Sequence, residues 1–431
     1  MLSLEAAATL MRINLAGNDM SDTGVLLDKI TFLVGNKNIL LNSSSIPAFP
    51  AFSECVVSFL SDLSRELLSI KNIRQHQDVL SYAYWIRKAS IEREKQNYDI
   101  EHRIGRGVAF HIAPSNVPVN FAVSMTSSLL AGNITVIRVS NKQFEEVSII
   151  CDAINRLLSK SEHESMRSHV CIVRYEHSDE ITGFLSSLCD VRIIWGGDRT
   201  INEIRKFTIP SRAIEMCFAD RHSIAVIDPD VYLQSDPADV ANKFYTDTYY
   251  SDQNACSSPR IVIWTKESDE AKRRFWNALK EKVDREYEMS PIQAVDKQSV
   301  FTELAMKSGA VSLYKDGELK NPDNRLIVVD VDSLEITGGE TIMDYKMGGG
   351  YFFQYTVSSL YEIVPILNKK CQTVAVMGLD KNDIVSFLMS KGVRGIDRVV
   401  NLGDTMGLEF VWDGYNMIES MSREVYIYEG K

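Results

Sequence analysis

The chain has 431 residues, which is too many for one compact core and suits two domains, and its 45% of hydrophobic residues are enough to fill both cores. A formal net charge of -11 provides no cationic field for nucleic acid or anionic lipid, so neither is an expected partner. The cysteines are scattered without a Cys-X-X-Cys pair or a close Cys/His cluster, which indicates a cytoplasmic location and argues against a metal site.

Two segments bear on targeting. Residues 1–22 have no basic region ahead of an apolar run, so we expect no secretory signal and a mature protein that begins near residue 1. Residues 117–137 carry no charged side chain, but their Pro, Gly, Asn, Ser and Thr residues are too polar for a membrane span. We predict a loop, a buried helix, a tight turn and a strand there instead.

Helices are expected within residues 54–95, and from residue 107 the hydrophobic pattern predicts strands that alternate with helices. The expected order is a strand at 107–112, a helix at 119–130, a strand at 134–139, a helix at 144–159, a strand at 170–173, a helix at 179–188 and a strand at 191–195. Strands separated by helix-length segments predict an α/β protein with a doubly wound parallel sheet.

A second α/β segment follows the strand at 223–227, where Asp228, Pro229 and Asp230 mark a boundary. We expect helices at 237–251 and 267–284 and strands at 261–264, 325–330 and 372–377. The predicted division is a first domain at 1–225, a second at 226–412, and a C-terminal segment at 413–431 that returns to the first domain or to an oligomer interface.

Three turns that follow predicted strands are candidate ligand contacts, because ligands of such sheets bind beyond the carboxyl ends of strands. In APSNVP (113–118), two prolines stiffen the chain around Asn116, whose amide either donates into a cleft or satisfies the turn itself. In the turn at 138–142, Arg138, Ser140 and Lys142 suit a phosphorylated ribose; the alternative is a solvated basic loop.

The third turn, WGGD (195–198), places paired glycines between a strand and a helix. Gly196 and Gly197 allow the backbone to approach a pyrophosphate at the helix N-terminus. The alternative is that Asp198 simply caps the helix, with Thr200 in its first turn.

One cysteine lies where a nucleophile is expected. Cys256 in QNACSSPR (253–260) is surrounded by small polar residues directly before the strand at 261–264, which leaves its sulfur room to meet a carbonyl carbon. The alternative is a half-buried structural cysteine.

Taken together, these segments resemble the aldehyde dehydrogenase superfamily. More specifically, the chain is similar to the acyl-CoA reductase family that supplies long-chain aldehyde to bacterial luciferase. The resemblance runs from about residue 100 to the end, and its motifs are APSNVP (113–118), LAGNITVIR (130–138), WGGD (195–198), QNACSSPR (253–260), KCQTV (370–374), WDG (412–414) and SREVYI (422–427).

The resemblance implies specific roles. Cys256 matches the nucleophile, and Asn116 matches the asparagine that holds the oxyanion together with the cysteine backbone N–H. Arg138 stands where a lysine commonly contacts the adenosine ribose, and no glutamate follows at Ser140 or Asn141 to bind a ribose diol, which favours NADP(H). The other implied cofactor contacts are Ser115, Ser140, Gly196, Gly197, Asp198, Thr200 and, at the nicotinamide ribose, Glu362.

The chain departs from the superfamily at the general base, a glutamate that activates water. Glu215 lies one position from that place, and it is either a displaced base or a structural residue. His111 and His222 are expected to be packed or capping residues. Loss of the base fits an enzyme that exchanges its acyl thioester with CoA instead of hydrolysing it.

The predicted function is therefore NADPH-dependent reduction of a fatty acyl-CoA or other acyl thioester to the aldehyde through a cysteine acyl-enzyme. The resemblance also implies an acyl-protein synthetase partner and a homo-oligomer. The alternatives are an aldehyde dehydrogenase that works in the oxidative direction and a non-catalytic protein of the same fold.

Overall fold

The computed structural model describes residues 20–309, 311–314, 323–336 and 338–430, so the expectations for the N-terminal residues 1–19 lie outside the described part of the chain. The chain divides into two compact units, one formed by Met1–Ala219 with Met417–Lys431 and the other by Asp220–Asn416. No helix among the described residues is both long and apolar enough to cross a bilayer.

The predicted domain boundaries differ from these limits for a structural reason. Residue 225 lies within β8 (His222–Ile227), and this whole strand belongs to the second unit because it pairs with β9 (Pro259–Trp264) and β15 (Cys371–Met377). Residue 413 lies in the turn of the hairpin formed by β17 (Val411–Trp412) and β18 (Tyr415–Asn416), which also belongs to the second unit.

In the part of the first unit that the structure describes, a six-stranded sheet has the order β1-β5-β4-β3-β6-β7. Its strands are β1 (Thr31–Val34), β3 (Val108–Ile112), β4 (Ile134–Arg138), β5 (Val170–Arg174), β6 (Val191–Trp195) and β7 (Ile214–Phe218). All neighbouring pairs are parallel except β1 and β5. The chain winds outward in both directions from β3 and β6, which confirms the predicted doubly wound sheet.

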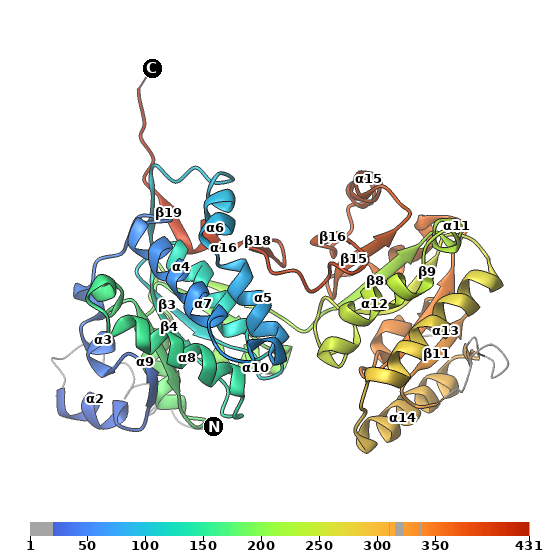
Figure 1. The fold of residues 1–431 in the computed structure, drawn as a ribbon, viewed down its shortest axis with the longest axis horizontal. Helices are drawn as coiled ribbons and strands as arrows, with labels where there is room; N and C mark the ends of the chain where they lie inside the picture. The colour runs from blue at the N-terminus through green and yellow to red at the C-terminus, as the bar shows by residue number, and fades with distance from the viewer. Residues whose placement is uncertain (1–19, 310, 315–322, 337, 431) are drawn as a thin grey trace. The chain divides into compact units, whose positions relative to one another are not determined.

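Helices cover both faces of this sheet (Figure 1). They are α2 (Met20–Leu27), α3 (Lys37–Leu41), α4 (Glu54–Leu68), α5 (Gln77–Trp85), α6 (Lys88–Lys95), α7 (Asn120–Leu130), α8 (Glu145–Leu158), α9 (Asp179–Leu188) and α10 (Asp198–Ile204), with 3₁₀ turns η1 (Ser43–Ser45), η2 (Ile73–Gln75) and η3 (Ser161–Met166). Successive residues of β3 face opposite layers: Phe110 packs in one cluster with Ile181 of α9, whereas His111 bonds Ser124 of α7.

The C-terminal residues complete the first unit. α16 (Met417–Met421) leads into β19 (Ser422–Glu424), which pairs antiparallel with β2 (Arg103–Gly105). The buried Asn133 side chain donates to the Met421 carbonyl at 3.0 Å, and the Arg106 guanidinium donates to the Ser420 carbonyl at 3.0 Å.

The described residues of the second unit form a seven-stranded sheet in the order β10-β11-β14-β9-β8-β15-β16, parallel except for β10. Its further strands are β10 (Val311–Leu313), β11 (Ile327–Val331), β14 (Tyr351–Thr356) and β16 (Arg398–Asn401), and β12 (Glu335–Ile336) pairs with β13 (Glu340–Thr341). Its helices are α11 (Pro229–Leu233), α12 (Pro237–Asp247), α13 (Asp269–Glu286), α14 (Pro291–Lys307) and α15 (Lys381–Lys391), with η4 (Tyr249–Ser251), η5 (Ile342–Tyr345) and η6 (Leu360–Ile366).

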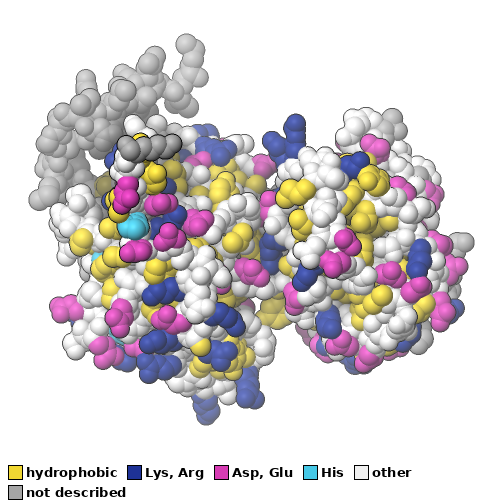
Figure 2. All heavy atoms as spheres, turned by 90° about the horizontal axis from the view of Figure 1, so that it is seen from above, with side chains coloured by type: hydrophobic (Ala, Val, Ile, Leu, Met, Phe, Trp, Pro, Cys, Tyr) yellow, Lys and Arg dark blue, Asp and Glu magenta, His cyan; other side chains and the backbone are white. Residues whose placement is uncertain are grey.

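Two apolar cores lie on opposite faces of this second sheet. Val262 and Trp264 of β9 face an aromatic cluster that includes Phe244 of α12 and Trp276 of α13. The alternate residues of β9 face the other core, to which α14 contributes Leu304. On the surface, acidic and basic side chains are interspersed over the face drawn in Figure 2.

Candidate functional site

Except for Glu362, which belongs to the second unit, the predicted cofactor residues lie at one edge of the first sheet. Strands β4, β3 and β6 are parallel neighbours, so their carboxyl ends meet at the same edge. Ser115 and Asn116 follow β3 and are exposed, Arg138 ends β4, and Gly196 follows β6. The topology therefore brings together turns that are far apart in the sequence.

Arg138 is held but not fully paired. Its guanidinium lies 4.9 Å from the centre of the Tyr175 ring, and its buried Nε has no hydrogen-bond partner. Within the turn after β4, the Ser140 hydroxyl accepts from the Lys142 N–H at 3.2 Å, and the Ser140 carbonyl accepts from Arg174 at 3.1 Å. A half-buried cation with an unsatisfied N–H fits a phosphate, whereas residues 139–144 offer no carboxylate for a ribose diol.

Of the two glycines in the turn after β6, only Gly196 is closely packed. A Cβ on Gly196 would lie 3.0 Å from the Thr200 side chain, whereas a Cβ on Gly197 would meet nothing within 4 Å. The alternative interpretation, in which Asp198 caps the helix, is wrong, because Gly197 is the N-cap and Asp198 is the first residue of α10. Thr200 thus packs against the turn that precedes its own helix.

Glu362 has a local structural use. It lies in η6, and its Oε1 accepts from the N–H groups of Ser358 and Ser359 at 2.9 and 3.0 Å, completing a capping box with the Ser359 side chain. A nicotinamide-ribose contact by Glu362 stays a prediction.

Cys256 lies at the amino edge of the second sheet, not at the carboxyl edge. It is half-buried in the turn between η4 and β9. The preceding Asp252 and Gln253 both have left-handed backbones, with φ of 55° and 58°. Two consecutive non-glycine residues in this conformation are unusual and are typical of a loop held by its surroundings.

Gln253 supplies that hold, and sequence analysis assigned it no role. Its side chain is fully buried, accepts from the N–H groups of Gly350 and Tyr351 at 3.0 and 3.2 Å, and donates to the carbonyls of Pro259 and Tyr351 at 3.0 and 3.2 Å. One amide therefore ties the loop before Cys256 to the start of β14.

A polar network of distant residues surrounds the Cys256 sulfur. The Gln372 side-chain amide donates to Sγ at 3.2 Å and also donates to Asp413 Oδ1. Arg221 donates to the same Asp413 oxygen at 3.1 Å and pairs with Asp397. The motifs KCQTV (370–374) and WDG (412–414) contain Gln372 and Asp413, but no role was predicted for either residue.

The environment keeps the resting sulfur protonated. Burial raises the pKa of the Cys256 thiol to about 11, and the negative charge of Asp413 adds to the rise, whereas the hydrogen bond from Gln372 and the charge of Arg221 oppose it. A thiol of this kind is a weak nucleophile until its proton leaves, so the donor to the sulfur matters for reactivity.

Two β-bulges lie beside the nucleophile, on either side of Ser223 in β8. In β15, Gln372 and Thr373 together oppose Ser223, because Cys371 pairs with His222 and Val374 pairs with Ile224. In β9, the pairing moves from Pro259 to Ile261 while β8 advances by only one residue, from Ser223 to Ile224. Bulges are common next to active sites because they redirect side chains.

Glu215 is paired in a way that argues against a catalytic base. Arg192 Nε donates to its carboxylate at 2.8 Å and Arg205 Nε at 2.6 Å. Burial works to raise the pKa of Glu215, but the hydrogen bonds from Arg205 and Arg192 outweigh it and lower that pKa. The structural interpretation therefore fits better than the displaced base.

The two histidines near the motifs are packed side chains. His111 Nδ1 lies 2.7 Å from Ser124 Oγ, and both ring nitrogens of the buried His222 lack a hydrogen-bond partner. Burial lowers the pKa of His111 to about 3, and burial followed by the nearby charge of Lys346 lowers that of His222 to about 3. Both rings are neutral at physiological pH.

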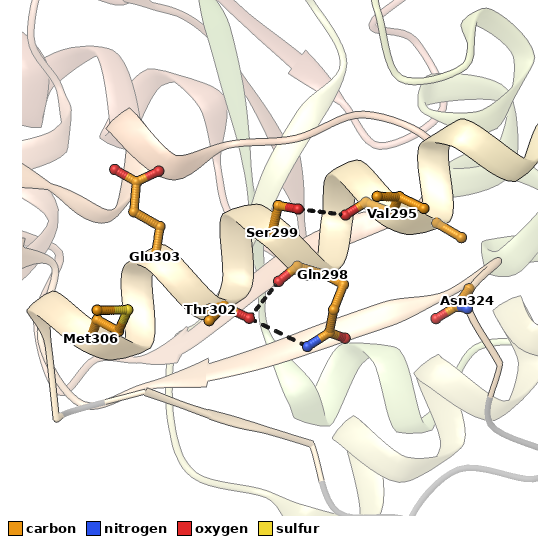
Figure 3. A pocket seen from close by; sticks show the side chains of 8 residues that line it. Val295, Gln298, Ser299, Thr302, Glu303, Met306 and Asn324 are labelled. Carbon is orange, nitrogen blue, oxygen red and sulfur yellow. Dashed lines mark hydrogen bonds between the residues drawn. The ribbon is translucent and has the colours of Figure 1, made fainter.

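Two other features do not coincide with the predicted residues. A surface hollow of about 640 Å³ lies along α14. Its lining, drawn in Figure 3, includes the exposed Val295 and Met306 but no predicted site residue. Among the described residues, Asp62, Glu162 and His163 form a group that could hold a metal ion. The Asp62 carboxylate already pairs with Arg65 and lies 3.0 Å from His163 Nε2, which makes an ion-pair cluster the simpler interpretation.

Comparison with solved structures defines the class of protein. Aldehyde dehydrogenase 21 from Physcomitrella patens superposes with a TM-score of 0.62 and 13% identity, covering 89% of this chain and 87% of its own. An aldehyde dehydrogenase from Brucella melitensis superposes with a TM-score of 0.59 and 13% identity, covering 91% and 88%. The protein therefore has the aldehyde dehydrogenase fold.

Within that fold, residues 44–424 match the family described as Acyl-CoA reductase (LuxC), and the chain belongs to this family. The resemblance found in the sequence is thereby confirmed. A long-chain acyl-protein thioester reductase of Aliivibrio fischeri is 23% identical over 304 residues, which cover 69% of this chain and 58% of that relative. The chain thus spans less than two thirds of the relative's length.

Proposed function

We propose that the protein reduces a long-chain acyl thioester to the aldehyde with NADPH, through a covalent acyl group on Cys256. The observation that carries the proposal is the half-buried Cys256 sulfur, which lies in a strained, tightly held turn and receives a side-chain hydrogen bond. Membership of the acyl-CoA reductase family supports the substrate class, and the Aliivibrio fischeri relative's name supports a thioester carried by a protein.

The Cys256 thiolate would attack the thioester carbonyl carbon, and the carbon–sulfur bond to the carrier would break, so that the carrier thiol leaves and the acyl group stays on Cys256. Asn116 and the Cys256 backbone N–H would hold the negative charge that develops on the carbonyl oxygen. Asn116 belongs to the first unit and Cys256 to the second, so their joint action is part of the proposal. When bound, the nicotinamide supplies the hydride that releases aldehyde and regenerates the Cys256 thiolate.

The cofactor contacts would come from the carboxyl edge of the first sheet. Arg138 is assigned the 2′-phosphate of NADPH because its guanidinium keeps an unsatisfied buried N–H and no carboxylate lies in the turn. The turns that carry Ser115, Ser140 and Gly196 would contact the rest of the dinucleotide, with Gly197, Asp198 and Thr200 at the start of α10. Glu362 would keep its capping role and also contact the nicotinamide ribose.

The oxidative alternative, aldehyde to acid, needs a base to activate water against the acyl-enzyme. Glu215 is the nearest match in the sequence, and its two arginine partners make it a poor one. Transfer of the acyl group from or to a thiol needs no such base, which favours reduction. An acyl-protein synthetase as the source of acyl groups and a homo-oligomeric assembly complete the proposal.

The test is an NADPH-oxidation assay over acyl-CoA substrates from short to long chains, with acylated carrier protein as a second substrate and aldehyde identified by mass spectrometry. We expect aldehyde in step with NADPH consumed, and faster turnover of long chains. Aldehyde and NADP⁺ supplied with and without CoA test the reverse direction. Formation of free acid without CoA would favour the oxidative alternative, and no turnover in either direction would favour a non-catalytic role.

A further inference from the structure

We infer that Gln372 is a catalytic residue whose side-chain amide stabilises the Cys256 thiolate, and that Asp413 and Arg221 are positioning residues that fix the direction of this amide. The inference rests on the proposed role of Cys256 as the nucleophile. Its basis is the contact between Gln372 Nε2 and Cys256 Sγ at 3.2 Å, made by a side chain that is fully buried.

The direction of the amide follows from its neighbours. An amide group can present either its oxygen or its nitrogen to the sulfur, and only the nitrogen donates. Asp413 Oδ1 already accepts from Arg221 at 3.1 Å, so this oxygen can face only the nitrogen of the Gln372 amide. On the other side, the Gln372 oxygen receives the Thr373 hydroxyl at 3.2 Å. With one N–H on Asp413, the second N–H is directed at the sulfur.

A β-bulge in the backbone of β15 positions this amide. Gln372 itself lies in the β15 bulge. In regular pairing each residue of β15 would oppose one residue of β8, and the strand would contain no extra residue. Ser223 joins the bulge to the nucleophile, because its hydroxyl accepts from the Thr373 N–H at 3.1 Å and donates to the Cys256 carbonyl at 2.8 Å. Ser223 of β8 therefore helps to position both Gln372 and Cys256.

Asp413 also differs from an ordinary turn residue. It lies with Gly414 in the two-residue turn between β17 and β18, and both have positive φ, 49° and 75°, which is common for an Asp-Gly hairpin. Such a turn leaves the aspartate side chain free to face solvent, yet here that side chain is only 6% exposed and is paired with Arg221. Turn formation alone does not explain a buried carboxylate beside the nucleophile.

The positive and negative charges around the Cys256 sulfur have opposing effects on the thiolate. The uncharged N–H donor of Gln372 is therefore important for stabilising it. Arg221 favours the thiolate and Asp413 disfavours it, and Arg260 and Arg398 also interact electrostatically with Cys256. Arg260 is engaged with the Met347 carbonyl at 2.7 Å, and Arg398 with the Thr405 carbonyl at 3.1 Å. Among the described contacts of the sulfur, Gln372 provides the side-chain N–H donor.

The experiment measures the alkylation rate of Cys256 by iodoacetamide in the full chain, by peptide mass spectrometry, in wild type and in Gln372→Leu. Loss of a hydrogen bond to a charged sulfur raises the thiol pKa by about one to two units. Because a more basic thiolate is also more nucleophilic, the rate at fixed pH should fall by about 3- to 10-fold. Gln372→Glu, which places a carboxylate against the sulfur, should lower the rate further.

Two controls separate this role from packing. Cys217, half-buried and without a contact to Gln372, should keep its alkylation rate in every variant. Thr373→Val removes the hydroxyl on the amide oxygen but leaves the donor, so the Cys256 rate should stay within about twofold. Thermal melting verifies folding, and Gln372→Met removes the donor equally if the leucine variant does not fold.

An unchanged Cys256 rate in Gln372→Leu, or an equal fall at Cys217, would overturn the inference. The assay uses neither acyl thioester nor cofactor, so it is independent of the proposed function. A selective fall at Cys256 in a protein without NADPH-dependent reduction would support the Gln372 role and reject the proposed reaction. Normal NADPH-dependent reduction with an unchanged alkylation rate in Gln372→Leu would support the proposed reaction and reject the Gln372 role.

Discussion

Replacement of Arg138 by alanine tests how the first sheet distinguishes the two nicotinamide cofactors. The guanidinium ends β4, lies over the Tyr175 ring at 4.9 Å and has a buried Nε without a partner. A charge-assisted hydrogen bond to a 2′-phosphate contributes about 1.5 to 3 kcal/mol, so Arg138→Ala should raise the Kd for NADPH by about 10- to 150-fold. NADH lacks this phosphate, and its Kd should change little.

The Tyr175 contact predicts a second, separate effect of the same variant. Stacking of a guanidinium on an aromatic ring contributes about 0.5 to 1 kcal/mol, which should appear as a small fall in Tm without either cofactor. Both Kd values can be measured by fluorescence titration, without catalysis. Lys142→Ala, in the same turn but exposed, is the matched control and should weaken NADPH only slightly. Equal weakening of NADPH and NADH by Arg138→Ala would refute the assignment.

Four further outcomes are expected. Cys256→Ser should abolish turnover and labelling by radioactive acyl-CoA, whereas Cys217→Ser should keep both; equal loss would reject the nucleophile. Asn116→Ala should lower kcat by about 100- to 1000-fold with a small change in KM, and native kcat in a folded variant would remove it from the mechanism. Glu215→Gln should destabilise the first unit by about 3 to 5 kcal/mol in urea unfolding, since a buried guanidinium loses its partner, while activity per folded molecule persists; a stable but inactive variant would reinstate the base. The pKa of His222 is lowered to about 3 from 6.5, so its neutral ring contributes stability above pH 6.5 that is lost as pH falls. Between pH 8 and pH 5, the free energy of unfolding of wild type should therefore fall by about 2 kcal/mol relative to that of His222→Leu. Parallel pH profiles of the two proteins would contradict this.

Much of the fold could be predicted because each buried strand is a continuous apolar run between turn residues. The strand at 108–112 and the helix at 120–130 lie where the pattern placed them, within a residue or two. Several strands were not predicted, and β7 and β14 show why. β7 contains Glu215, whose charge is neutralised by arginines from β6 and just after α10, and β14 begins directly after three glycines that read as a loop. Tertiary partners, which a local pattern cannot reveal, decide both.

The candidate site divides in the same way. Cys256 and the turn at Arg138 carry local signals, because a reactive thiol needs small neighbours and a phosphate needs cations. Gln372 is 116 residues from Cys256 in the sequence, and Asp413 is 41 residues further on. Only parallel pairing of β15 and β9 with β8, together with the β17–β18 hairpin, brings these side chains to one sulfur. No spacing rule joins residues so far apart.

The return of the chain to the first unit has a consequence for the order of folding. All the strands and helices of the second unit lie between residues 220 and 416, whereas the first unit lacks α16 and β19 until residues 417–424 have been synthesised. Until then β2 has no antiparallel partner in β19, and Asn133 lacks the Met421 carbonyl. The second unit can therefore complete its core first, and closure of the first unit is a long-range, late event of the kind that slows folding. Released chains that end near residue 416 should hold a protease-resistant second unit and a first unit that is still cleavable.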